Sequence, residues 1–192
     1  MAEQQYFLIP DTETGGLDSK KHKLCEIGAT VFDNSGKKVD EFHALLNPKE
    51  DSKMQTLYAM KINRCYKRYG PQTNQLSNQD VADHFVRWLL DMSEKYSPVL
   101  AGQNLQFDIR FISEFLEAHG YENWNEIFGF HHLDTTMLAK ALQLSGLLKT
   151  KKLNLGALAE EFKIINPDAH TAIADCETTA LVLINMLNLI KK

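Results

Sequence analysis

Two acidic residues, Asp11 and Glu13, stand two positions apart near the start of the sequence. They follow the apolar run 6–9, which predicts a buried strand. Because side chains alternate along a strand, both carboxylates should project from the same face. Adjacent carboxylates repel each other unless a cation lies between them, and all-oxygen ligation favours Mg²⁺ or Mn²⁺. The pair is therefore a candidate metal site, although a polar strand end facing solvent is the better explanation for a single Asp-x-Glu taken alone.

A third carboxylate, Asp108, falls in the first turn of a predicted helix. A strand candidate at 99–101 precedes it, and Asn104 is the predicted N-cap. Asp108 lies four residues before Ile112, on the apolar stripe that should face the sheet. A buried acidic residue is costly unless it is paired or binds a metal. A first-turn Asp is also favoured by the helix dipole, so the residue alone leaves both explanations open.

The third candidate group is His170 with Asp175. Five positions along one continuous helix correspond to roughly 140° of rotation, so the two side chains would not share a face. They can converge only if His170 lies in the loop after Pro167 and the helix begins near Thr171, its predicted N-cap. Either residue alone would be an ordinary surface residue near a helix start.

These groups occur in order across nearly the whole chain, as the strings Asp11-Thr12-Glu13-Thr14-Gly15-Gly16, Gly102-Gln103-Asn104-Leu105-Gln106-Phe107-Asp108 and His170-x-Ala172-x-x-Asp175. Together they resemble the DEDD family of 3′-to-5′ exonucleases, in the subgroup (DEDDh) whose last motif carries histidine. Members of that subgroup include the polymerase proofreading epsilon subunit, oligoribonuclease and RNase T. The segments Leu133-Asp134-Thr135 and 153–158 are also similar to segments of this family.

The resemblance implies an α/β, ribonuclease-H-like fold, with a five-stranded mixed β-sheet flanked by helices on both faces. It implies an enzyme that hydrolyses phosphodiester bonds of single-stranded DNA or RNA from the 3′ end, releasing nucleoside monophosphates. Two divalent cations, Mg²⁺ or Mn²⁺, would be its cofactors, and a polymerase or other replication or repair protein is a possible partner. The implied metal ligands are Asp11, Glu13, Asp108 and Asp175, with His170 as general base. The implied substrate-binding residues are Thr14, Gly15, Asn104 and Phe107.

The hydrophobic periodicity agrees with this fold. Strand candidates cover 6–9, 24–32 and 39–46, and Asn34-Ser35-Gly36 predicts a hairpin turn. Helical spacing then predicts helices near 81–92, 109–119, 135–144, 153–162 and 173–190, with short strands at 99–101 and 131–133. Strands first and alternation afterwards predict a mixed sheet covered on both faces. Pro10 lacks a backbone N–H, so we expect lost pairing or a bulge there.

Composition limits the remaining possibilities. The chain has 192 residues, 44% of them hydrophobic, which predicts a single exonuclease domain over 1–192. A net charge of −4 argues against a protein that coats nucleic acid by bulk positive charge. The longest apolar run, 181–190, is too short to span a membrane, and no secretory signal opens the sequence. Three cysteines are too few for a disulfide framework. We therefore expect a cytoplasmic protein without a membrane partner.

Two basic groups could contact phosphates or simply form solvated charged faces: Lys20, Lys21, His22 and Lys23, and Lys61, Arg64, Lys67 and Arg68. A catalytically idle nucleic-acid-binding or polymerase-docking module is the main alternative to an enzyme. The complete carboxylate set argues against it, and the His170 and Asp175 arrangement does not favour a phosphatase or integrase.

Overall fold

The computed structural model describes residues 4–68 and 76–191. Within these residues five strands form one mixed sheet in the order β3-β2-β1-β4-β5. The strands are β1 (Tyr6–Thr14), β2 (Leu24–Asp33), β3 (Lys38–Leu45), β4 (Val99–Gly102) and β5 (Leu133–Asp134). The first three pair antiparallel, whereas β4 pairs parallel with both β1 and β5. The predicted mixed sheet is confirmed, and its parallel half brings the ends of β1, β4 and β5 to one edge.

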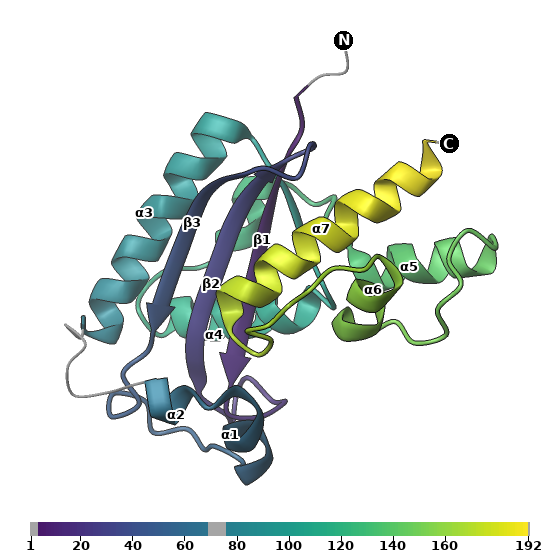
Figure 1. The fold of residues 1–192 in the computed structure, drawn as a ribbon. Helices are drawn as coiled ribbons and strands as arrows, with labels where there is room; N and C mark the ends of the chain where they lie inside the picture. Colours follow the sequence, from purple (N-terminus) through teal and green to yellow (C-terminus); the bar gives the residue numbers. More distant parts are fainter. Residues whose placement is uncertain (1–3, 69–75, 192) are drawn as a thin grey trace.

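Helices cover both faces of this sheet (Figure 1). They are α1 (Leu57–Asn63), α2 (Cys65–Arg68), α3 (Asn78–Tyr96), α4 (Gln106–Glu117), the 3-10 helix η1 (Trp124–Phe128), α5 (Thr135–Leu144), α6 (Leu155–Glu161) and α7 (Ala172–Ile190). Leu8 of β1 packs in the core beneath α3 and α4. Its neighbours Phe7 and Ile9 pack on the other face, with α7. This alternation fixes which side chains of β1 can meet which helix.

The first strand is longer than its apolar run, and the bulge expected at Pro10 is not there. Pro10 pairs with Ala29 without interruption, and the register shift of this ladder lies between Glu13 and Thr14. Pairing of β1 with β4 is confined to Phe7 and Leu8. An unbroken ladder with β2 requires the missing N–H of Pro10 to point away from β2, where pairing with β4 has already ended. The strand therefore carries Asp11 and Glu13 in regular β geometry.

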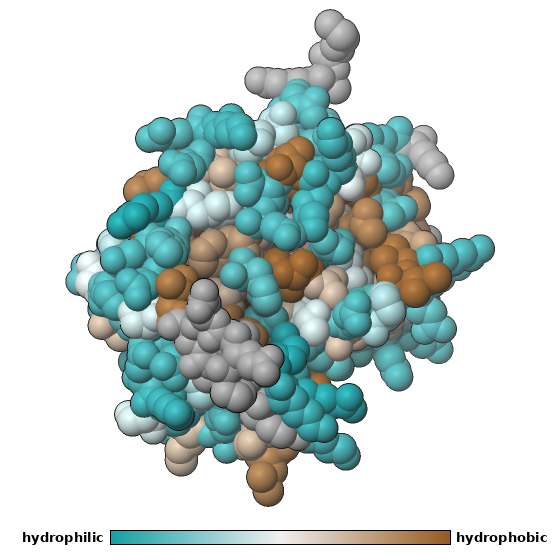
Figure 2. Space-filling view, turned by 60° about the vertical axis from the view of Figure 1, so that its left-hand side comes forward, coloured by the Kyte–Doolittle hydropathy of each residue, from teal (hydrophilic) through white to brown (hydrophobic). Residues whose placement is uncertain are grey.

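The last helix supplies much of the core. Among the described residues, α7 is the one helix whose length and composition would allow it to cross a membrane. In the structure it packs against β1, β2, α5 and α6, and Val182, Leu183 and Met186 are fully buried. Its apolar character is therefore accounted for by packing on the sheet. The face seen in Figure 2 is largely hydrophilic, with apolar residues in small separate groups.

Candidate active site

The carboxyl-terminal half of β1 carries the first two candidate ligands. Asp11 and Glu13 share the strand face of Phe7 and Ile9, which is the face that α7 covers. Gly28 of β2 pairs with Asp11. A Cβ at Gly28 would lie 2.8 Å from the carbonyl carbon of Ala172. The glycine thus allows the start of α7 to approach the sheet beside Asp11.

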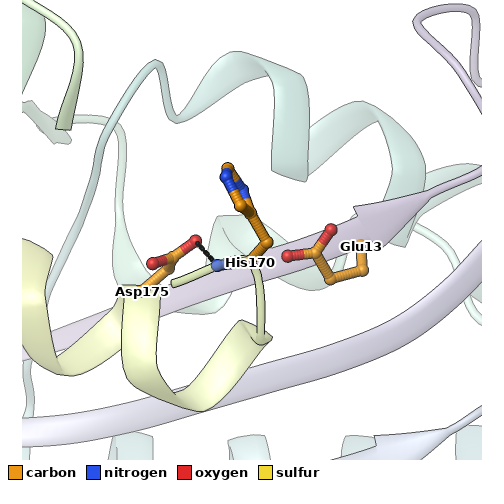
Figure 3. A group of neighbouring side chains, drawn as sticks. All are labelled: Glu13, His170 and Asp175. Carbon is orange, nitrogen blue, oxygen red and sulfur yellow. Dashed lines mark hydrogen bonds between the residues drawn. The ribbon is translucent and has the colours of Figure 1, made fainter. Parts of the chain in front are cut away.

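The start of α7 brings His170 and Asp175 to Glu13 (Figure 3). Ligand atoms of these three side chains all lie within 4.8 Å of one another. His170 lies in the loop before the helix, with a left-handed φ of 71°, and Thr171 is the N-cap. The predicted convergence through a loop histidine is therefore what the backbone shows. The Thr171 side chain, however, makes no capping hydrogen bond.

Asp175 is held from two sides. Its Oδ2 accepts a hydrogen bond from the backbone N–H of His170 at 3.2 Å, and its Oδ1 accepts one from Asn166 Nδ2 at 2.7 Å. Burial raises the pKa of Asp175, while these two hydrogen bonds lower it. The loop conformation and the carboxylate orientation thus depend on each other.

Asp108 enters from the opposite layer. It lies in the first turn of α4 and is 4% exposed, as its place on the apolar stripe predicts. Thr12, which points to the α4 side of β1, donates from Oγ1 to Asp108 Oδ1 at 2.7 Å. Asp108 is close enough to Asp11 that its charge disfavours ionisation of Asp11 and raises the pKa of that carboxyl.

The charges at this site are poorly compensated within the protein. Burial, followed by the charges of Asp108, Asp175 and Glu13, raises the pKa of Asp11 well above its usual range. Burial and the neighbouring Glu26 raise the pKa of Glu13 to about 8. Burial raises the pKa of Asp108 to about 7. Clustered carboxylates that resist ionisation are stabilised by divalent cations, and an all-oxygen donor set fits Mg²⁺ or Mn²⁺. The residues present therefore fit the expected metal ions.

A cavity of about 530 Å³ opens beside Glu13. Two of the predicted substrate-binding residues, Thr14 and Phe107, line it, and so do Leu17 and Tyr58. The side chains of Leu17 and Tyr58 are exposed. Tyr58 precedes the basic residues 61–68 in the sequence, and a tyrosine among basic residues is a candidate for stacking on bases. Leu17 lies outside the expected strands and helices, and an exposed apolar side chain carries no positional signal, so its place at the cavity could not be predicted from the sequence.

The other two predicted substrate-binding residues do not line this cavity. Gly15 is buried, its N–H donates to the Lys23 carbonyl at 2.8 Å, and its carbonyl accepts from Thr56 N–H at 2.7 Å. A Cβ at Gly15 would lie 2.7 Å from the Met54 carbonyl oxygen, so the glycine shapes the turn behind the site. Asn104 is exposed and has a left-handed φ of 54°.

Asn104 is also not the N-cap of α4. Leu105 occupies that position and makes no side-chain capping bond. The carboxylate of Asp134 instead accepts hydrogen bonds from the N–H groups of Leu105 (2.9 Å) and Asn104 (3.3 Å). The same carboxylate caps α5 by accepting from Thr136 N–H at 2.8 Å. Asp134 thus accepts hydrogen bonds from the backbone at the starts of two helices, α4 and α5. This is possible because the parallel strands β4 and β5 end side by side.

Known proteins share this architecture. Residues 8–183 match the RNase T family, described as exonuclease. The PolC-type DNA polymerase III of Thermotoga maritima is 26% identical over 97% of this chain, and the matching part is 12% of that polymerase. The epsilon subunit of DNA polymerase III from Rickettsia conorii is 26% identical over 94% of this chain and 73% of the subunit. The chain therefore spans only about an eighth of the PolC-type relatives.

Solved structures agree at the level of the fold. E. coli exonuclease I in complex with a dA16 oligonucleotide superposes with a TM-score of 0.74, at 19% identity, over 97% of this chain and 41% of that one. Cell-death related nuclease 4 superposes with a TM-score of 0.72, at 17% identity, over 96% of this chain and 64% of that one. The fold and the match over residues 8–183 agree with the family resemblance of the three motifs, and the chain belongs to the exonuclease family.

Proposed function

We propose that this chain is a metal-dependent 3′-to-5′ exonuclease that hydrolyses single-stranded nucleic acid to nucleoside monophosphates. The observation that carries the proposal is the meeting of Glu13, His170 and Asp175, beside Asp11 and Asp108, at the edge of a cavity. We treat residues 1–192 as one exonuclease domain. An idle binding module has no physical need for four clustered, poorly compensated carboxylates, so this set supports an active enzyme.

In this proposal Asp11, Glu13, Asp108 and Asp175 hold two Mg²⁺ or Mn²⁺ ions. When bound, the ions would lower the pKa of the attacking water and stabilise charge on the leaving oxygen. Their four positive charges would balance the four carboxylates. The burial of Glu13 and Asp108 limits competing solvation by water.

His170 is proposed as the general base. It lies in a loop, exposed to solvent, with its imidazole near Glu13 and Asp175. From there it can take a proton from water at the site and release it to bulk solvent. Histidine suits this task because it changes protonation state near neutral pH.

The cavity is the proposed site for the terminal nucleotide. A volume of about 530 Å³ falls within the range of small-ligand pockets. Thr14 lies next to Glu13 in sequence and is positioned to contact the sugar-phosphate end, while Phe107 and Tyr58 offer aromatic faces for stacking on bases. A pocket for one end of a strand favours removal of terminal nucleotides over internal cutting.

The similar proteins support a more specific proposal for the substrate, the partner and the cellular location. Because they are chains of DNA polymerase III, we propose the 3′ end of single-stranded DNA as substrate, a replicative polymerase as partner, and the cytoplasm as the place of action.

Single-stranded DNA and RNA oligonucleotides, labelled at the 5′ end, test the proposal with Mg²⁺ and with EDTA. We expect a ladder of shortened DNA in Mg²⁺ and none in EDTA. A closed circular single strand is the matched control, because it has no end to enter the cavity. Cutting of circles as fast as linear strands, or full activity of metal-free protein, would contradict the proposal. Degradation of RNA faster than DNA would identify RNA, and not DNA, as the substrate.

A further inference from the structure

Arg68, the last residue of α2, forms a two-pronged ion pair with Glu26 of β2. Its Nη1 donates to Oε1 at 2.6 Å and its Nη2 lies 2.5 Å from Oε2. The Glu26 side chain is 1% exposed, and His43 Nε2 lies 2.8 Å from its Oε1. Burial alone would raise the pKa of Glu26, but the hydrogen bonds from His43 and Arg68 lower it. Arg68 is therefore the partner of a buried ionised carboxylate, neither a phosphate contact nor part of a solvated charged face.

The same guanidinium reaches the end of α1. Its Nη2 also donates to the carbonyl oxygen of Asn63, the last residue of that helix, at 3.2 Å. Asn63 Nδ2 in turn donates to the carbonyl oxygen of Thr14, at the end of β1, at 2.9 Å. A hydrogen-bonded path thus runs from Glu26 on β2 through Arg68 and Asn63 to the strand end at the candidate active site.

Polar bonds tie both ends of α1 to the end of β1, since the N–H of its N-cap Thr56 also donates to the Gly15 carbonyl oxygen at 2.7 Å. The one buried residue of this helix is Asn63, whereas Leu57 and Tyr58 are exposed. Tyr58, Ile62 and Asn63 nevertheless line the cavity together with Phe107 of α4. Because α1 has seven residues, none of them a fully buried apolar one, and a helix so short is not stable alone, its position depends on the groups that tie it to the sheet.

We propose that Arg68 is a positioning residue for the substrate cavity, which fixes α1 against the end of β1 so that the terminal nucleotide meets a preformed wall. This inference rests on the proposed function. Loss of Arg68 should release α1, while the sheet, α4 and α7 still carry the four carboxylates. Arg68 also favours the ionised form of Glu13, so the comparison is made at saturating Mg²⁺, where bound metal ions would favour that form instead. Substrate binding should therefore suffer more than hydrolysis.

Steady-state kinetics on a 5′-labelled single-stranded oligonucleotide test this with Arg68→Met and Arg68→Lys. For Arg68→Met we expect KM to rise roughly tenfold or more, because a charge-assisted hydrogen bond that fixes α1 is lost. We expect kcat to stay within about threefold of wild type. Lysine keeps the charge but not the two-pronged geometry, so it should recover part of KM. An unchanged KM, or a fall in kcat at unchanged KM, would overturn the proposal.

Hydrogen–deuterium exchange separates this proposal from the proposed function, since it needs no activity. In Arg68→Met the amides of α1 should exchange faster, while those of β1 and β2 should not. Arg87→Met, an exposed arginine on α3, is the matched control and should change neither. If Arg68→Met does not fold, Glu26→Gln should show the same change in α1 on a smaller scale. Wild-type exchange in α1 of a folded variant would overturn the proposal even if the enzyme proves to be a nuclease.

Discussion

At the residue scale, the carboxylate cluster makes the metal-free protein sensitive to pH. Burial and Glu26 raise the pKa of Glu13 from 4.5 to about 8. Between these values the folded protein binds a proton that the unfolded chain has released. Stability contributed by this group therefore falls as pH rises through the window. Divalent ions oppose that fall, because they favour the ionised carboxylates.

The first prediction concerns Glu13→Gln. In EDTA, wild-type protein should lose stability relative to this variant as pH rises from about 5.5 to about 8, because glutamine has no charge to bury. Mn²⁺ should raise the wild-type Tm more at the higher pH. Thermal unfolding at both pH values measures this. Glu94→Gln, an exposed residue on α3, should follow wild type. A wild-type protein that gains stability relative to Glu13→Gln with rising pH would contradict the prediction.

The second prediction separates the two residues that α7 brings to the site. His170→Ala should lower kcat by roughly 10²–10⁴-fold while leaving Mn²⁺ affinity nearly intact, because a general base moves a proton and holds no metal. Asp175→Asn should weaken Mn²⁺ binding by more than roughly tenfold.

Calorimetric Mn²⁺ titration and pH–rate curves of both variants measure these effects. The acid limb of the wild-type kcat profile should change in His170→Ala. The imidazole lies within ligand distance of Glu13 and Asp175, so an equal loss of metal binding in both variants would make His170 a ligand and refute its assignment as base.

At the scale of elements, one carboxylate fixes two helices. Asp134 caps α5 and also accepts from the backbone at the start of α4, the helix that carries Asp108. Its contribution is therefore both to stability and to the position of a candidate metal ligand.

The third prediction follows from that double cap. Asp134→Ala should lower the free energy of unfolding by about 1–2 kcal/mol and should weaken Mn²⁺ binding roughly tenfold, through a displaced Asp108. Ser77→Ala is the matched control, because Ser77 caps α3 through a side-chain bond to Asp80 N–H away from the carboxylates. It should cost similar stability without changing metal affinity. Equal Mn²⁺ affinities of the two variants would show that Asp108 does not depend on this cap.

At the scale of the whole molecule, the negative net charge of the metal-free protein disfavours the binding of a polyanion such as nucleic acid. The chain has 25 acidic and 21 basic residues, and several carboxylates gather where the substrate would enter. Two divalent ions would cancel the formal net charge of −4, so substrate binding and metal binding should be coupled.

The fourth prediction tests that coupling with a single-stranded DNA carrying 3′-phosphorothioate linkages to resist cleavage. Its affinity, measured by fluorescence anisotropy, should fall at least roughly tenfold when EDTA replaces Mn²⁺. Because burial and the neighbouring carboxylates raise the pKa of Asp11, Asp11→Asn in EDTA should bind DNA more tightly than wild type only at a pH high enough to ionise Asp11. Equal wild-type affinity with and without metal would contradict this electrostatic account.

Local geometry explains what the sequence by itself determined. Residues two apart in a strand share a face, which placed Asp11 beside Glu13. Helix rotation required His170 to leave the helix, and the structure puts it in the preceding loop. The apolar stripe of α4 likewise predicted that Asp108 is buried. These are consequences of backbone dihedral angles and side-chain periodicity, which involve only neighbouring residues.

The remaining features depend on contacts between distant segments, and only the tertiary structure decided them. Asn104 does not cap α4, and Asp134 instead binds the backbone N–H groups just before this helix, because β4 and β5 are neighbours in the sheet. Arg68 pairs with Glu26, 42 residues away, and Tyr58 faces a cavity that α4 completes. No periodicity encodes such pairs. A polar group that folding buries needs a hydrogen-bond partner, and the order of strands in the sheet decides which side chains lie near enough to provide one.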